Sequence, residues 1–297
     1  MAFSLDMLNN RFVELIKTAE DRAALIEATD LFLRQKIRED SFFRQILTPR
    51  IITPAECDRS VTHRGLSKII DIEPDSTAYA IDFRGDTPVH YLHADRYEVK
   101  FYTIESEEFQ IKEQELLSYE APITEIIRKN SEYDIAKVED TKFMAAVNAA
   151  ITSTGKDVAA AGSSFVKKDF ANAFKLLDGN ELKAAIVLIN GEVYDDINAW
   201  DNSELGDTLL GEVTVNGYSH QTLMGRKLVV TNKGSIVPSN KLFVFTDQQY
   251  LGHAFVLSEE IKFDLFTEFD LIRFKAWETM AAGIGNANAV ASCTISG

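Results

Sequence analysis

Apolar residues recur at helical spacing along the first part of the chain. Residues 8–47 contain no Gly or Pro, and their apolar positions are interleaved with charged ones such as Glu20 and Lys36. This pattern predicts helix, either as one segment or, with Asp30 as a cap, as two. The segment ends before Pro54, because the residue that precedes a proline is pushed out of the α region. The apolar positions that carry the pattern are Leu25, Ile26, Leu31 and Leu33.

A second helical pattern covers residues 122–151, and a third covers residues 164–177. Gly155 follows the second segment and predicts its end. Asn130 and Ser131 either bend this helix or divide it. The apolar positions of the second pattern are Ile123, Ile126, Ile127, Ile135, Val138, Met144 and Val147.

Between these helical segments the apolar pattern changes to strict alternation, which predicts strands. Residues 79–83 and 97–103 alternate in this way, and a turn signal at residues 84–88 separates them. We expect a long β-hairpin, between residues 68 and 111, whose wide tip lies near residues 84–96. Because an isolated two-stranded ribbon is marginal in water, it must lie either on its own domain or on a neighbouring subunit.

Strand patterns dominate the last part of the chain. Residues 184–189 form a continuous apolar run, which is typical of a buried strand, and a short helix follows at residues 193–200. The whole pattern predicts an α+β fold with a compact mixed domain at about residues 156–255. The first and last thirds of the chain are expected to meet in a second domain. Further strands are expected at residues 211–215, 227–231, 241–246, 253–257, 262–266 and 271–280.

The composition is typical of a soluble globular chain, with 45% hydrophobic and 26% charged residues. No run reaches the roughly 18 consecutive apolar residues that would span a bilayer. The first residues lack the basic and apolar regions of a secretion signal, so we expect no membrane contact and no secretion. Cys57 and Cys293 lie near opposite ends without metal-type spacing, which predicts two buried, reduced thiols.

The net charge of -15 argues against a dedicated nucleic-acid binder, because an acidic surface repels phosphate backbones. Such a surface serves solubility, and it also suits the wall of a container that must not adhere to packaged DNA. Charge alone does not choose between these two roles.

The candidate metal ligands are His90 and His93, with Asp86 and Asp95 nearby. On a strand the two histidines would point to opposite faces, so we expect surface or interface histidines and no metal. A metal-dependent hydrolase that uses them is the weakest functional alternative. The sequence contains no nucleophile elbow, phosphate loop or His-Glu-x-x-His motif. We therefore predict no catalytic residue, no cofactor and no enzymatic activity.

Four local patterns follow one another between residues 183 and 297. They are the strand end Leu188-Ile189-Asn190, the strand that rises from Gly225 to Val229-Val230-Thr231, the apolar run Phe243-Val244-Phe245 after Pro238, and the closing stretch from Phe274 to Val290.

These patterns, together with the order of elements along the whole chain, resemble the major capsid proteins of tailed bacteriophages. Thr246 departs from that family, in which a Gly is common at this point. The resemblance implies a tailed-phage capsid fold of five parts. They are an N-terminal arm at 1–60, an extended β-hairpin or E-loop at 61–111, the spine helix of the P-domain at 112–155, an axial A-domain at 156–255, and return strands of the P-domain at 256–297.

The resemblance also implies a function. Copies of the chain would assemble as hexamers and pentamers into an icosahedral capsid that encloses double-stranded DNA without sequence-specific contact. Assembly would take place in the host bacterial cytoplasm, with a portal and, in some members, a decoration protein. The short N-terminal arm implies a separate scaffolding protein or none. Encapsulins, which are cellular compartments that hold a cargo enzyme, have a similar fold and are the main alternative.

The hairpin is the part that would overlap a neighbouring subunit. Some capsid proteins of this family are cross-linked through a lysine of the hairpin, but residues 84–96 contain no lysine, so we expect no such bond. The hairpin residues expected to contact neighbours are Tyr79, Ile81, Phe83, Arg84, Asp86, His90, Tyr91, Arg96, Tyr97 and Phe101.

Overall fold

A computed structural model of the chain describes most residues from 38 to 295. The described ranges are 38–59, 65–74, 76–83, 85–86, 94–116, 123–160, 162–198, 222–258 and 261–295, together with residues 89, 91 and 200. Residues 8–37 of the helical segment expected at 8–47, and the strand expected at residues 211–215, lie outside them. Within residues 38–47 only Phe43–Ile46 are helical, so the prediction was wrong for residues 38–42. The reason is a tertiary contact, because the Ser41 hydroxyl and the Phe43 N–H donate to the side chain of Asp140. Within the described ranges, no helix is long and apolar enough to cross a membrane.

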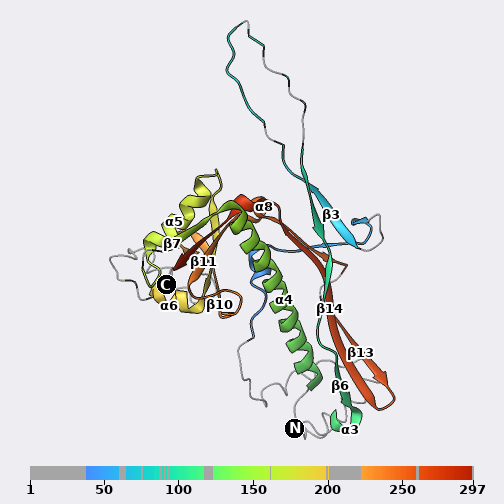
Figure 1. Ribbon diagram of the computed structural model, residues 1–297. Coiled ribbons are helices and arrows are strands. Elements are labelled where there is room, and N and C mark those ends of the chain that lie inside the picture. The colour runs from blue at the N-terminus through green and yellow to red at the C-terminus, as the bar shows by residue number, and fades with distance from the viewer. Residues whose placement is uncertain are drawn as a thin grey trace, which may run out of the picture.

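The longest element is helix α4, Ile123–Thr154, which runs along the middle of the molecule (Figure 1). It continues through Asn130 and Ser131 without a break, and Ser131 lies on its buried side. Gly155 follows it with a φ of 67° and donates its N–H to the carbonyl of Ile151 at 2.8 Å. Glycine reaches this left-handed conformation at little cost, so it ends the helix as the sequence predicts.

The first sheet is built around one long strand, β14, which packs against α4. One edge of β14 pairs with β12 and β13, and the other edge pairs with β5 and β6. Strand β1 adds a parallel strand beside β12. The bounds are β14, Leu271–Ile284; β12, Gly252–Leu257; β13, Lys262–Glu268; β5, Tyr102–Glu105; β6, Phe109–Lys112; and β1, Arg50–Ile52.

The second sheet has the strand order β7-β15-β11-β8-β10-β9. Helices α5 and α6 pack against it. The strands predicted between residues 227 and 280, and the helices predicted at residues 164–177 and 193–200, are confirmed in these two sheets and their helices. The bounds are β7, Asp157–Ala160; β8, Ala184–Asn190; β9, Thr222–Leu223; β10, Arg226–Thr231; β11, Lys241–Thr246; β15, Val290–Ile295; α5, Lys167–Asp178; and α6, Gly191–Asn198.

The strand pairing differs from the expected division of the chain near residue 255. Strand β15, expected among the return strands of 256–297, lies between β7 and β11 in the second sheet. Strand β12, expected to fall within 156–255, belongs to the first sheet. The reason is burial: the first four residues of β15 are buried, and helices α4 and α5 pack against this strand in the second sheet.

Strands β3, Leu66–Asp71, and β4, Arg96–Lys100, form the base of a hairpin that extends away from the body (Figure 1). The described residues between them form no strand. The prediction that residues 79–83 pair as a strand with residues 97–103 was therefore wrong. The base is stabilised because Val99 of β4 is buried against the body, whereas residues 79–83 have no sheet beneath them.

Four short elements and a 3-10 turn complete the part of the chain that the structure describes. Helix α2 precedes β1, α3 follows β6, α8 precedes β12, and β2 pairs with β3. Their bounds are α2, Phe43–Ile46; α3, Glu113–Leu116; α8, Gln248–Leu251; and β2, Asp58–Arg59, with one 3-10 turn at Ala287–Ala289.

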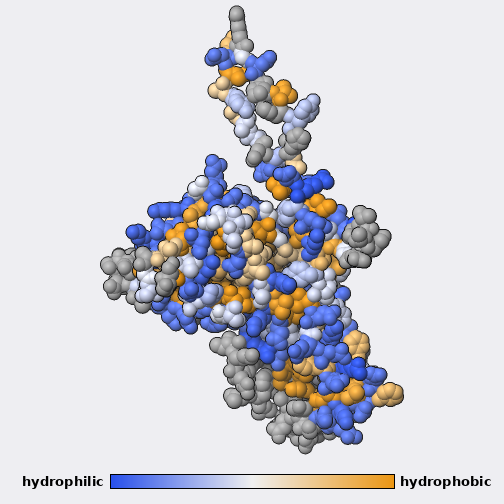
Figure 2. All heavy atoms as spheres, viewed as in Figure 1, coloured by the Kyte–Doolittle hydropathy of each residue, from blue (hydrophilic) through white to orange (hydrophobic). Residues whose placement is uncertain are grey.

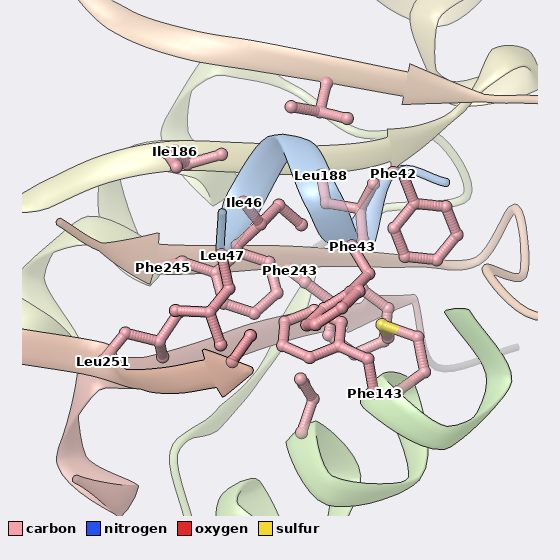
Figure 3. Close-up of a cluster of buried hydrophobic side chains, with 14 of the residues drawn as sticks. Phe42, Phe43, Ile46, Leu47, Phe143, Ile186, Leu188, Phe243, Phe245 and Leu251 are labelled. Carbon is pink, nitrogen blue, oxygen red and sulfur yellow. The ribbon is translucent and has the colours of Figure 1, made fainter. Parts of the chain in front are cut away.

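The main hydrophobic core lies where α2 is enclosed by α4 and the second sheet (Figure 3). The ring centroids of Phe43 on α2 and Phe143 on α4 are 5.0 Å apart. Those of Phe143 and Phe245 on β11 are 5.8 Å apart. Met280 of the first sheet belongs to the same cluster. One core therefore joins the N-terminal segment, the helix and both sheets.

Candidate assembly surface and buried charged junction

The tip of the hairpin presents apolar side chains to solvent. Phe83, Val89 and Tyr91 have relative exposures of 107%, 95% and 92%, and Tyr79 and Ile81 are about half exposed. Figure 2 shows apolar residues along this arm, which in this view extends away from the rest of the described chain. Five exposed large apolar residues on one narrow arm are unusual for a soluble monomer and are typical of an interaction surface.

The base of the arm is held against the body by close packing. Val99 lies over Gly283, and Tyr97 lies over Gly285. The Tyr97 hydroxyl is hydrogen-bonded to Nδ1 of His253 on β12. Burial raises the pKa of Tyr97 to about 12 and lowers the pKa of His253, so the hydroxyl donates to a neutral imidazole. These contacts fix the direction in which the arm leaves the body.

The hairpin residues predicted to contact neighbours fall into three groups. Tyr79, Ile81, Phe83, Asp86 and Tyr91 are exposed on the arm, and their contacts with neighbours stay a prediction. Arg96 is also exposed, but it donates a hydrogen bond to Asp71 at 2.6 Å across the base. Tyr97 and Phe101 are partly buried and pack against their own chain. Arg84 and His90 lie outside the described residues, as does His93 of the proposed metal pair.

A second feature was not predicted from the sequence: a buried group of charges where α2, α4 and β14 meet. Arg44 of α2 binds Glu139 of α4 with two hydrogen bonds, at 3.0 Å from Nε and 2.8 Å from Nη2. The same Nη2 atom lies 2.8 Å from both carboxylate oxygens of Glu278 on β14. Neither carboxylate side chain has any exposed surface.

An adjacent ion pair ties the same helix to the second sheet. Asp140 accepts hydrogen bonds from the Ser41 hydroxyl at 2.8 Å and from the backbone N–H of Phe43 at 3.0 Å. Its other oxygen accepts from Lys233 at 2.6 Å. Asp140 thus caps the segment that leads into α2 and joins it to the loop after β10. We call Arg44, Glu139 and Glu278, together with Asp140 and Lys233, the charged junction.

The sequence contains a signal for this junction. Glu139 lies on the same helical face as the buried residues Ile135 and Phe143, at a spacing of four residues from each. Glu278 lies in the alternating buried row of β14, between Ala276 and Met280. An acid at a core position of a periodic pattern indicates a buried partner, because an unpaired buried charge is strongly unfavourable.

The two glutamates of the junction have opposite pKa shifts. Burial raises the pKa of Glu278 to about 8, and the hydrogen bond and negative charge of Glu139 add to this effect. Burial also acts to raise the pKa of Glu139, but the hydrogen bonds and charge of Arg44 outweigh it and lower that pKa. The junction thus holds one carboxyl that keeps its proton near neutral pH and one that does not.

The described residues offer little for catalysis or metal binding. Among them, no group of three or more His, Cys, Asp or Glu side chains is arranged to hold a metal ion. The charged junction is enclosed and tied to structural partners. The features that stand out are mechanical: an exposed apolar arm and a buried electrostatic connection between the parts of the body.

Neither a protein-family model nor a curated protein sequence matches this chain. Solved structures do. A structure of Microbacterium phage Oxtober96 superposes with a TM-score of 0.69 at 11% identity, and the match covers 89% of this chain and 94% of that one. A capsid structure of the cyanophage P-SCSP1u matches with a TM-score of 0.66 at 12% identity, covering 90% and 91%. The capsid of an empty GTA particle matches with a TM-score of 0.58 at 11% identity, covering 91% and 94%.

The chain therefore has the fold of a capsid shell subunit. In particular, it has the α+β fold of tailed-phage major capsid proteins over most of its length, which confirms the predicted fold class.

Proposed function

We propose that this chain is the major capsid protein of a tailed bacteriophage, and that it builds a closed icosahedral shell from many copies of itself. The observation that carries the proposal is the arm: a hairpin with exposed Phe83, Val89 and Tyr91 on a body that has the capsid fold. Apolar surface of this extent gains free energy when a second molecule covers it, at about 25 cal/mol for each Å² removed from water.

The proposal assigns a task to each part of the chain. The arm covers a neighbouring subunit, and the second sheet with α5 and α6 forms the axial domain around which hexamers and pentamers form. Individual contacts are weak, so misplaced subunits can dissociate, while closure of the shell makes the sum of contacts large. The role is structural and needs no enzymatic activity.

The proposed partners follow from the same role. Packaged double-stranded DNA would lie inside the shell without sequence-specific contact, which agrees with the net charge of -15. A portal and a separate scaffolding protein would act during assembly in the host bacterial cytoplasm, and some shells of this kind add a decoration protein. The mature protein would reside in the virion.

The experiment replaces the described tip of the arm and leaves its base intact. Residues 76–91 are exchanged for a short Gly/Ser linker, because Val99 and Tyr97 at the base contribute to the body. Wild-type protein, produced together with the scaffolding protein, should form closed particles in negative-stain micrographs. The variant should keep the wild-type melting temperature but sediment as small oligomers.

A matched control separates loss of apolar surface from loss of length. The full-length variant Phe83→Ser, Val89→Ser and Tyr91→Ser keeps the arm and should also fail to close shells. Normal closed particles from both variants would contradict the proposed role of the arm. Wild-type particles that hold a protein cargo and no DNA would contradict the phage assignment and support an encapsulin-type compartment.

A further inference from the structure

The charged junction contains more negative than positive charge at its centre. Glu139 and Glu278 are both fully enclosed, and Arg44 is the cation that contacts both. Two ionised carboxylates against one guanidinium would leave a net negative charge without water around it, which is strongly unfavourable. The two carboxyl groups also meet at one atom, because Nη2 of Arg44 lies 2.8 Å from an oxygen of Glu139 and 2.8 Å from both oxygens of Glu278.

We propose that Glu139 and Glu278 share one proton in the folded chain, held on Glu278, and that its release loosens the contact among α2, α4 and β14. The junction is then a pH-sensitive connection inside each subunit. This inference concerns the folded chain by itself and does not rest on the proposed capsid function.

The geometry decides which carboxyl carries the proton. Arg44 binds Glu139 through Nε and Nη2, a two-pronged contact that favours the ionised form of Glu139. Glu278 shares only the Nη2 atom. A protonated Glu278 can donate to Glu139 while its second oxygen accepts from Arg44, so every polar atom of the pair is satisfied. The raised pKa of Glu278, about 8, agrees with this assignment.

Among the described residues, Lys129 of α4 lines a pocket together with Arg44 and Glu139, but it is exposed and makes no ion pair with either carboxylate. Tyr102 of β5 is kept neutral, since burial and the two glutamates raise its pKa to about 12. On β5 the residue in register with Glu278 is the apolar Ile104. Asp140 on α4 is occupied by Lys233, and burial raises its pKa.

The other charged residues of β13 and β14 lie on the opposite face of the sheet from Glu278. Side chains alternate between faces along a strand, so positions one residue from Glu278 point away from it. Lys262 of β13 is in register with Trp277 and therefore lies on that opposite face. Arg273 and Lys275 of β14 occupy the same odd-numbered row.

The expected pH dependence follows from the direction of the shift. A glutamate in an unfolded chain has a pKa of about 4.3, whereas Glu278 in the folded chain has a pKa of about 8. Between these values the folded chain binds more protons than the unfolded chain, so its stability falls as the pH rises, and it levels off above about pH 8. The pKa of Glu139 is lowered by folding, so Glu139 adds to the stability of the folded chain while it is ionised. This contribution to stability is lost only in acid, where Glu139 takes up a proton.

The test compares the full-length protein with the variant Glu278→Gln, because glutamine keeps the shape and the hydrogen-bond donor of a protonated glutamic acid. Thermal unfolding is followed from pH 6 to pH 9. The wild-type melting temperature should fall across this range, while that of Glu278→Gln should stay level and exceed the wild-type value at pH 9. The control is Glu105→Gln, an exposed acid paired with Lys275 at 2.7 Å, which should keep the wild-type pH dependence.

Infrared spectroscopy gives a readout that a purely structural role would not change. Wild-type protein and Glu105→Gln should show the band of a protonated carboxyl at pH 7, and Glu278→Gln should lack it. In the wild type this band should disappear as the pH rises through about 8. Because this measurement uses only the wild-type protein, it tests the proposal even if a variant fails to fold. Absence of the band from the wild type at pH 7, or an unchanged pH dependence in Glu278→Gln, would overturn the proposal.

Discussion

The ring of Tyr97 lies against the backbone of Gly285, so closely that a Cβ atom at Gly285 would be 2.8 Å from Cζ of the tyrosine. The two residues come from distant parts of the chain, one at the base of the arm and one at the end of β14. Their contact allows the Tyr97 hydroxyl to reach His253. The absence of a side chain at Gly285, together with that at Gly283 beneath Val99, therefore sets how closely the base of the arm packs against the body.

The variant Gly285→Ala should displace the base of the arm. The added methyl group forces the tyrosine ring away, which should lower the free energy of unfolding by about 1–3 kcal/mol, the usual effect of overpacking. Shell closure should decline as well, because the arm leaves at a different angle. Thermal melting and sedimentation measure the two effects.

The control for this variant is Gly65→Ala, because nothing lies within 4 Å of a Cβ at Gly65, near the start of β3. Its stability and assembly should match the wild type. Equal behaviour of the two alanine variants would contradict the role given to the contact between Tyr97 and Gly285.

Phe143 is the aromatic residue at the centre of the main core, between Phe43 and Phe245. We expect Phe143→Ala to lower the free energy of unfolding by about 3–5 kcal/mol, since it removes a buried ring and leaves a cavity. On the same helix Val138 is 40% exposed, and Val138→Ala should change stability by no more than about 0.5 kcal/mol. Val138 belongs to the helical pattern seen in the sequence, yet it is the more exposed of the two side chains. Chemical denaturation of both variants tests this contrast; similar losses would contradict the burial of Phe143 in the core.

The two cysteines should be unreactive in the folded protein and should not link subunits. Both are buried and belong to different clusters, and burial raises the pKa of the Cys293 thiol to about 12. Because the thiolate is the reactive form, alkylation at pH 8 should be slow for native protein and rapid after denaturation. Particles run on a non-reducing gel should give monomers. A dimer band that disappears with reductant would contradict this prediction.

Shells built from this chain should contain no covalent bond through the arm. Residues 72–95 include no lysine, and the nearest lysines, Lys68 and Lys100, lie in the paired strands of the base. We expect boiled shells to migrate as single chains in denaturing electrophoresis. A ladder of covalent oligomers would show that a lysine elsewhere in the chain forms the bond.

The local sequence pattern was enough to predict two kinds of element. One is a helix whose apolar residues repeat at regular spacing, and the other is a strand that is buried along its whole length. Helix α4 was predictable because its apolar residues repeat at helical spacing up to Gly155, and β8 and β11 because a buried strand is a continuous apolar run. The order of these elements, together with local patterns near the C-terminal end, was also enough to indicate the capsid fold that the solved structures share.

Only the tertiary structure decided what depends on partners far apart in the chain. The sequence pattern could not decide whether residues 66–71 or 79–83 pair with β4, because that choice depends on which strand lies over the body. It could not place β15 between β7 and β11, nor bring Glu139 to Glu278. Alternation and helical spacing say which side of an element is buried, but not which element covers it, because the covering residue comes from folding of the whole chain.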